Sequence, residues 1–324
     1  MEDSRLRGPI LSDAFRDYVD PIFAAAIFVL GLCFGSFLNV CIYRLPLGIS
    51  VVTPRSACPK CKQGIALYDN MPVLSWLVLR GRCRHCKAKI SARYLIIELL
   101  TGLLFLGCYW YFGLTLSTLK YCAFGFLVLG LIFTDAETKL LPDKLTLTGL
   151  ALGIGFSLFV PLYDLASQFL PGILNLPFSG GISERLYSLL DSLLGAAIGA
   201  SFIYGAGAIY LRWRGTEGMG FGDVKLMAMV GAFLGLKLTV LTIFSASLAG
   251  SVFGLSTVLI VWLKRTHRFA KRFADAAAAR RRAWHSAQVV YRNYQMPFGV
   301  FLGSMALVAL FFGDRFLRWY GRFF

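Results

Sequence analysis

Charged side chains are scarce in this chain of 324 residues, where they make up 15% of the sequence. Ordinary soluble proteins carry about 25%. Hydrophobic residues reach 57%, and the mean hydropathy is +0.66. This composition excludes a soluble globular domain. Apolar runs long enough to cross a bilayer recur along the chain, so the sequence predicts an all-α polytopic membrane protein.

Several common catalytic and binding patterns are also missing. Histidine occurs only three times, with neither a serine–histidine arrangement nor the His-Glu-x-x-His spacing of zinc proteases. The sequence contains no Walker loop, no dinucleotide fingerprint and no internal repeat. Serine hydrolase, zinc protease and nucleotide-binding chemistry are therefore disfavoured.

The hydropathy pattern predicts eight membrane helices. The first apolar run lacks a small-residue cleavage site, so we interpret it as a retained helix rather than a signal peptide. The predicted spans are residues 21–43, 94–112, 118–134, 144–162, 188–210, 223–236, 238–263 and 297–313.

The net charge of +16 is explained by membrane topology rather than by nucleic-acid binding. Residues 44–93 carry ten Lys and Arg against one acid, and residues 264–295 carry nine against one. The positive-inside rule places both segments in the cytoplasm and both termini outside. We also expect the basic segment 264–295 to lie as a helix on the anionic inner leaflet.

Two acids stand at the ends of predicted membrane helices. Asp135 ends the apolar run 127–134, and Asp223 follows the glycine-rich stretch 218–222. A carboxylate at this position is costly to keep and marks a functional site by default, the alternatives being a helix cap or a solvated loop acid. Two close carboxylates share one proton, as an aspartyl protease requires. We expect the glycines to let a substrate backbone approach closely.

Asp143 competes with Asp135 for the second catalytic position. It follows Pro142 and precedes an apolar run, where a helix N-cap is the simplest interpretation. Asp135 has no such capping explanation, so we predict that Asp135 and Asp223 form the catalytic pair. Glu137 is interpreted as a solvated loop charge.

Four of the eight cysteines form two Cys-x-x-Cys pairs, Cys58 with Cys61 and Cys83 with Cys86. This spacing is typical of a zinc ribbon, in which four thiolates hold one structural ion. Disulfides are rare in the cytoplasm, so metal binding is favoured over cross-linking, with a redox pair as the alternative. The remaining cysteines lie in apolar runs and are interpreted as core residues.

Six motifs in this order resemble the bacterial type IV prepilin peptidases, which are leader peptidases and N-methyltransferases of pilus assembly and type II secretion. The resemblance covers nearly the whole chain, although Leu95 stands where the family often has proline. The motifs are Gly35–Pro46, the two cysteine pairs, Ile90–Gly102, Asp135–Asp143, Gly218–Leu226 and Met296–Gly299.

The resemblance implies an inner-membrane enzyme that cuts a short basic leader from prepilins and pseudopilins at the cytoplasmic face. It also implies methylation of the new amino terminus with S-adenosylmethionine as donor. The family's catalytic aspartates fall on Asp135 and Asp223. We assign methyl transfer to residues 1–113, with the cysteine loop 44–93, and proteolysis to residues 114–324. Candidates for the donor or amine site are the polar residues Asn39, Arg44, Arg93 and Glu98.

Two other classes of function fit parts of the pattern. A non-enzymatic scaffold of a membrane assembly would use the cysteine loop and the basic segment as docking surfaces. A proton-coupled transporter would use the membrane acids as a relay, but transport sites lie near the bilayer midplane rather than at helix ends. The sequence leaves open which prepilins are cut, whether pili or secretion are served, and the oligomeric state.

Overall fold

The computed structural model describes residues 20–164, 167–168, 181–216, 218–270, 276–293 and 296–322. These residues are helical and contain no β-strand, which confirms the all-α class. The N-terminal tail and most of residues 164–187, which lie between the predicted fourth and fifth spans, are outside the described residues. The elements are α2 (Pro21–Arg44), η1 (Leu67–Asn70), α3 (Leu74–Val78), α4 (Arg93–Phe112), α5 (Leu116–Thr138), α6 (Asp143–Ser157), α8 (Gly181–Arg214), α9 (Phe221–Ala270), α10 (Ala276–Asn293), α11 (Phe298–Val308), η2 (Ala309–Gly313) and α12 (Asp314–Tyr320).

Among the described residues, six helical segments are long and apolar enough to cross a membrane. They are Pro21–Arg44, Arg93–Phe112, Leu116–Thr138, Ser183–Arg214, Phe221–Ala270 and Phe298–Tyr320. The predicted fourth span corresponds to α6, which has only 15 residues. The predicted sixth and seventh spans are the two parts of α9, which is interrupted at Gly235. The count of eight spans therefore stays a prediction.

The interruption in α9 has a local cause. Gly235 has φ 77° and ψ −179°, a conformation that residues with a side chain rarely adopt. Asp164 accepts a hydrogen bond from the Lys237 N–H at 2.8 Å and so caps the second part of the helix. A Cβ on Gly235 would lie 2.7 Å from the same carboxylate oxygen. The break therefore requires glycine both for its backbone and for the space that Asp164 occupies.

Close helix crossings depend on small residues. A Cβ on Gly195 of α8 would lie 2.4 Å from the Gly231 carbonyl oxygen of α9, so these two backbones touch. Gly31 and Gly35 of α2 approach α4 in the same way. Such contacts are typical of membrane helices, where packing replaces the hydrophobic effect between helices. The largest apolar core lies where α5, α9 and α11 meet.

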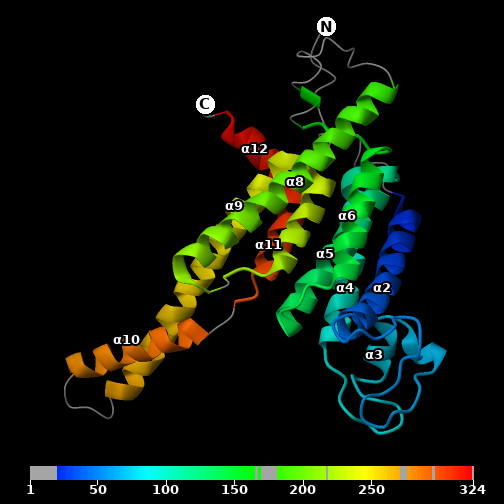
Figure 1. Cartoon of the computed structure of the whole chain (residues 1–324). Coiled ribbons are helices and arrows are strands. Elements are labelled where there is room, and N and C mark those ends of the chain that lie inside the picture. Colours follow the sequence, from blue (N-terminus) through cyan, green and yellow to red (C-terminus); the bar gives the residue numbers. More distant parts are fainter. Residues whose placement is uncertain are drawn as a thin grey trace.

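Segments that are far apart in the sequence lie at the same end of the helix bundle. The loop that carries α3 and the basic helix α10 lie at one end of the bundle, and α12 lies at the other (Figure 1). Helix α10 packs on the far end of α9, where Trp262 and Trp284 meet edge to face and Arg265 donates to the Ser286 carbonyl. The predicted basic segment is therefore a helical hairpin with α9.

Candidate functional site

The two predicted catalytic acids meet at one point of the fold. Asp135 lies in the last turn of α5 and Asp223 in the first turn of α9, and only 5% and 7% of their surfaces are exposed. A Cβ on Gly299 would lie 2.9 Å from Asp135 Oδ2 and 3.3 Å from Asp223 Oδ1. The two carboxylates therefore flank the same glycine, at the start of α11. This arrangement is what a pair of acids sharing one proton requires.

Helix α11 holds Asp135 in place. Pro297 occupies the N-cap of α11 and offers no side-chain acceptor to the free N–H groups of the first turn. Asp135 supplies one instead, because its Oδ2 accepts a hydrogen bond from the Val300 N–H at 2.9 Å. The Met296–Gly299 motif is visible in the sequence, whereas this contact is not. The available signal was a proline at a helix start with no capping residue beside it.

The glycines before Asp223 pack against the protein itself. A Cβ on Gly218 would lie 2.4 Å from the Tyr210 ring, and one on Gly222 would lie 2.8 Å from the Leu141 side chain. Only Gly220 has room for a Cβ, which would make ordinary contacts, the nearest with Asp223 Oδ2 at 3.8 Å. Gly218 and Gly222 thus have a packing role, and the expectation that the glycines make room for a substrate stays a prediction. These two let the start of α9 approach its neighbours.

Asp143 does not belong to the buried pair. Its side chain is 59% exposed and accepts a hydrogen bond from Lys225 Nζ at 2.6 Å. The interpretation of Asp143 as an N-cap is also wrong, since Pro142 is the N-cap of α6 and Asp143 lies in its first turn. An acid there is favourable because it faces the positive end of the helix dipole. The ion pair fastens the start of α6 to the start of α9.

The four loop cysteines form one cluster. Their sulfur atoms all lie within 4.8 Å of one another. In each knuckle the N–H of the first cysteine donates to the residue five positions later, and the lysine after the second cysteine donates back to the first cysteine's carbonyl. The residues are Cys58, Gln63 and Lys62 in one knuckle and Cys83, Ala88 and Lys87 in the other. Lys62 and Lys87 share a left-handed conformation, with φ 59° and 56°.

The geometry of the cluster fits a tetrahedral metal ion. Zn–S bonds of about 2.3 Å separate the sulfur ligands by about 3.8 Å. The Sγ atoms of Cys58 and Cys86 are 3.8 Å apart, and those of Cys61 and Cys83 are 4.0 Å apart. The backbone N–H groups of Cys61 and Lys60 lower the pKa of Cys58 to about 6, which favours the thiolate that a metal binds. None of these cysteines forms a disulfide.

Two of the four candidate residues for methyl transfer form hydrogen bonds between the C-terminal part of α2 and neighbouring segments. The Arg44 guanidinium donates to the carbonyls of Ser50 and Pro54 at 2.9 and 2.7 Å. Asn39 donates to the Tyr94 carbonyl of α4 at 3.1 Å, while its Oδ1 atom is buried without a hydrogen-bond partner. Arg44 thus shapes the loop, whereas Asn39 retains a free acceptor between α2 and α4.

Glu98 connects α4 to the start of α3. Its Oε2 accepts a hydrogen bond from the Val73 N–H at 2.8 Å, although only 8% of Glu98 is exposed. Val73 has φ 60°, a genuine outlier for a β-branched residue that costs about 1–2 kcal/mol. A conformation of this kind persists only where its surroundings impose it. Glu98 is thus a structural anchor for the strained turn before α3.

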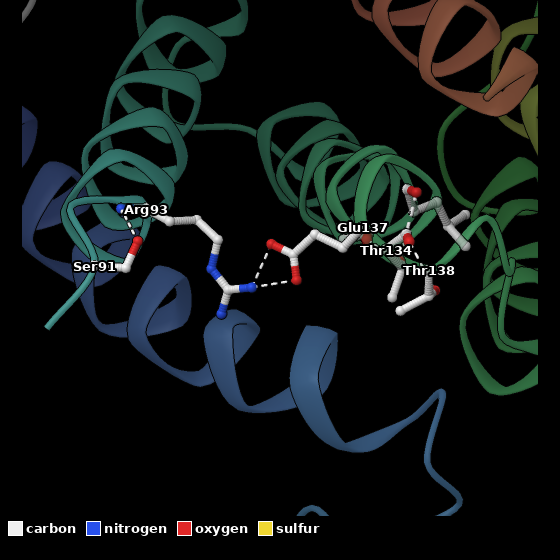
Figure 2. A network of polar contacts seen from close by, with 7 residues as sticks. Ser91, Arg93, Thr134, Glu137 and Thr138 are labelled. Carbon is white, nitrogen blue, oxygen red and sulfur yellow. Dashed lines mark hydrogen bonds and ion pairs between the residues drawn. The ribbon is translucent and has the colours of Figure 1, made fainter. Parts of the chain in front are cut away.

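Arg93 links the two halves of the chain. Its guanidinium, at the start of α4, points toward the Glu137 carboxylate at the end of α5 and forms an ion pair with it (Figure 2). Glu137 is therefore paired rather than free in solvent, which corrects its interpretation as a loop charge. Because Glu137 lies two residues after Asp135, this ion pair joins the first half directly to the turn that carries a candidate catalytic acid.

Comparison with known proteins identifies two matching families. Residues 29–112 match the bacterial peptidase A24 N-terminal domain, and residues 122–255 match the type IV leader peptidase family. No solved structure matches the chain.

Several curated relatives carry the name prepilin leader peptidase/N-methyltransferase. The Myxococcus xanthus protein is 40% identical over 75% of this chain, and the match spans 65% of that protein's length. The Aeromonas salmonicida protein is 31% identical over 92% of this chain and 94% of its own length. The Pseudomonas aeruginosa protein is 32% identical over 93% and 94%.

The sulfur geometry predicts about one zinc ion per purified chain by elemental analysis. The double substitution Cys58→Ser with Cys61→Ser should remove nearly all of it, because two ligands cannot hold the ion. Replacing Cys33, which lies in α2 away from the cluster, with serine is the matched control and should leave the zinc content unchanged. Full zinc content in the double variant would contradict the assignment.

Proposed function

Because the chain belongs to the type IV leader peptidase family, we propose that it removes the leader peptide from prepilins and then methylates the residue that the cut exposes. The substrates are prepilins and pseudopilins with short basic leaders. The observation that carries the proposal is the meeting of two buried acids, Asp135 and Asp223, beside Gly299 at the ends of three membrane helices.

The acid pair supplies the chemistry of peptide hydrolysis. One ionised carboxylate accepts a proton from a water molecule as the water attacks the scissile carbonyl, and the protonated partner donates a hydrogen bond to the carbonyl oxygen. The hydrogen bond from Val300 fixes the orientation of Asp135. Both acids lie at helix ends, the part of a spanning helix that is nearest to water.

The site faces the cytoplasm in an inner-membrane protein with eight spans and both termini in the periplasm. Two observations support this orientation. The segments richest in Lys and Arg, residues 44–93 and 264–295, are those that the positive-inside rule places in the cytoplasm. The loop that carries α3 and the helix α10 also lie at the same end of the bundle (Figure 1).

Methyl transfer belongs to residues 1–113 and proteolysis to residues 114–324. The four cysteines would hold a structural zinc ion, and S-adenosylmethionine would supply the methyl group. Among the first-half candidates, Asn39 and Arg93 retain buried atoms without hydrogen-bond partners, Oδ1 and Nε respectively. The Asn39 oxygen can accept a hydrogen bond from the new amine, and the Arg93 N–H can donate one to the carboxylate of the methyl donor. Arg44 and Glu98 act by positioning, because Arg44 bonds to loop backbone and Glu98 joins α4 to the Val73 N–H and to the Ser36 side chain of α2.

Asp135→Asn and Asp223→Asn should each lower leader cleavage by at least about a hundredfold, since an amide can fill neither role in the pair. Asparagine at position 135 still accepts the hydrogen bond from Val300, so the protein should stay folded. Cleavage of a synthetic prepilin, followed by mass spectrometry, measures the loss.

Asp143→Asn is the matched control for these two variants. It removes only an exposed ion pair, worth up to about 1 kcal/mol, and should retain most of the cleavage activity. An inactive but folded Asp143→Asn enzyme, or an active Asp135→Asn enzyme, would mean that the pair is assigned wrongly. Unchanged prepilin cleavage in cells that carry either of the first two variants, with no cleavage by the purified wild-type protein, is the result expected of a non-enzymatic scaffold.

Gly299→Ala should lower the turnover of cleavage by more than about tenfold with little change in KM, because the new methyl group would push the two carboxylates apart. The matched control is Gly250→Ala on the facing helix α9, where a Cβ would make ordinary contacts at 3.9 Å with α11. Steady-state cleavage kinetics of the two variants measure the change in turnover and in KM. Equal losses in both would point to general damage to α11 packing.

We expect that single substitutions can abolish leader cleavage and methyl transfer independently of each other. Asp223→Asn should still methylate a peptide supplied already cleaved, because its defect is confined to cleavage. Asn39→Ala should cleave normally and fail to methylate. Thr101→Val is the matched control, since Thr101 is equally buried at the contact of α2 with α4 but bonds only within its own helix.

The readout for this separation is the mass of each product, with the leader removed and with one methyl group added. Parallel loss of both activities in every first-half variant, at constant protein level, would mean that the halves form one coupled site.

A further inference from the structure

The loop between α2 and α4 exposes apolar side chains that no part of the described chain covers. Met71, Leu74, Leu77 and Val78 are 51%, 55%, 54% and 76% exposed, and three of them lie on the short helix α3. An apolar surface of this kind outside the spanning helices marks a contact with a partner or a membrane.

The position of α3 decides between these partners. Glu98 holds the residue before α3, Val73, and lies five residues into α4. At 1.5 Å per residue this is roughly 7 Å along the helix from its inner end. The headgroup region on each side of a bilayer is about 5–8 Å thick. The start of α3 therefore lies within roughly 7 Å of the level at which α4 enters the membrane, close to the lipid headgroups.

Cations surround a hollow directly after the apolar helix. The hollow has a volume of about 410 Å³ and is lined by Val78, Leu79, Arg80, Arg82, Cys83 and Lys87. The three cationic residues are exposed, and none of them forms an ion pair among the described residues. Apolar side chains beside unpaired cations, at headgroup depth, match the chemistry of an anionic phospholipid.

We propose that α3 inserts its apolar face into the inner leaflet and that Arg80, Arg82 and Lys87 bind the headgroup of an anionic phospholipid. The inference rests on the proposed cytoplasmic orientation. The strained turn at Val73, held by Glu98, directs α3 along the membrane surface. The four-cysteine loop is then fixed against the leaflet, at the depth where cleavage exposes the new amino terminus.

Hydrogen–deuterium exchange of the full chain in lipid nanodiscs tests the proposal without any substrate. Amides of residues 71–80 should exchange at least about tenfold more slowly in discs rich in phosphatidylglycerol than in phosphatidylcholine discs. Leu77→Glu with Val78→Glu should abolish this protection, whereas Leu77→Met with Val78→Ile should keep it. Arg80→Gln with Arg82→Gln should remove the dependence on phosphatidylglycerol.

Lys60→Gln with Lys62→Gln is the matched control, because it removes the same charge from the other knuckle and should leave the protection unchanged. Zinc content reports whether each variant keeps the loop folded. Equal exchange in both kinds of disc would overturn the proposal. So would equal protection by inorganic phosphate in detergent, or protection in detergent that grows with protein concentration, which would indicate a second copy of the chain.

If Arg80→Gln with Arg82→Gln loses zinc but keeps its dependence on phosphatidylglycerol, these cations serve the thiolates and the proposal is wrong. Leader cleavage, assayed separately in the same discs, shows whether the proposed enzymatic function fails independently.

Discussion

One hydrogen bond, from the Val300 N–H to Asp135 Oδ2, satisfies two requirements of this fold at once. A carboxylate buried without a donor is costly, and so is a helix start with free N–H groups in an apolar environment. Pro297 gives α11 no side-chain cap, and the backbone hydrogen bonds to the Asp135 carboxylate come from Val300 and Gly299 at the start of α11. Each group therefore needs the other, and their contact fixes the end of α5 against the start of α11. Asp223 completes the site from a third helix through the space that Gly299 leaves open.

The polar contacts of the first half gather at the same membrane level. Arg93 reaches Glu137, Glu98 reaches Val73, and Asn39 reaches the Tyr94 carbonyl, all near the inner ends of α2, α4 and α5. Charged and polar groups of spanning helices favour this level because water and headgroups are near. The consequence is that the cysteine loop and the acid pair lie toward the same end of the helix bundle, and the Arg93–Glu137 ion pair joins the two halves there.

Much of this arrangement follows from sequence patterns with a direct physical meaning. The scarcity of charge gives the helical membrane class, and the spacing of Cys58, Cys61, Cys83 and Cys86 predicts the cluster. The two acids stand out because a carboxylate at the end of an apolar run is costly to bury and so indicates a functional site. Contacts between distant segments carry no such local signal. In sequence Glu137 looks like a solvated loop charge and Asp143 like a helix N-cap, and only the fold shows that cations from α4 and α9 face them.

Glycine illustrates the same limit in a different way. The sequence suggests that the glycines around Asp223 serve a substrate, yet Gly218 and Gly222 serve the packing of Tyr210 and Leu141. The glycine that makes room between the acids is Gly299, which lies 76 residues later on another helix. Because an acid pair needs its two oxygens near one point, any side chain at that point would separate them. The acid pair therefore requires a glycine at this position. That glycine has to lie on the helix that approaches both acids, which here is α11.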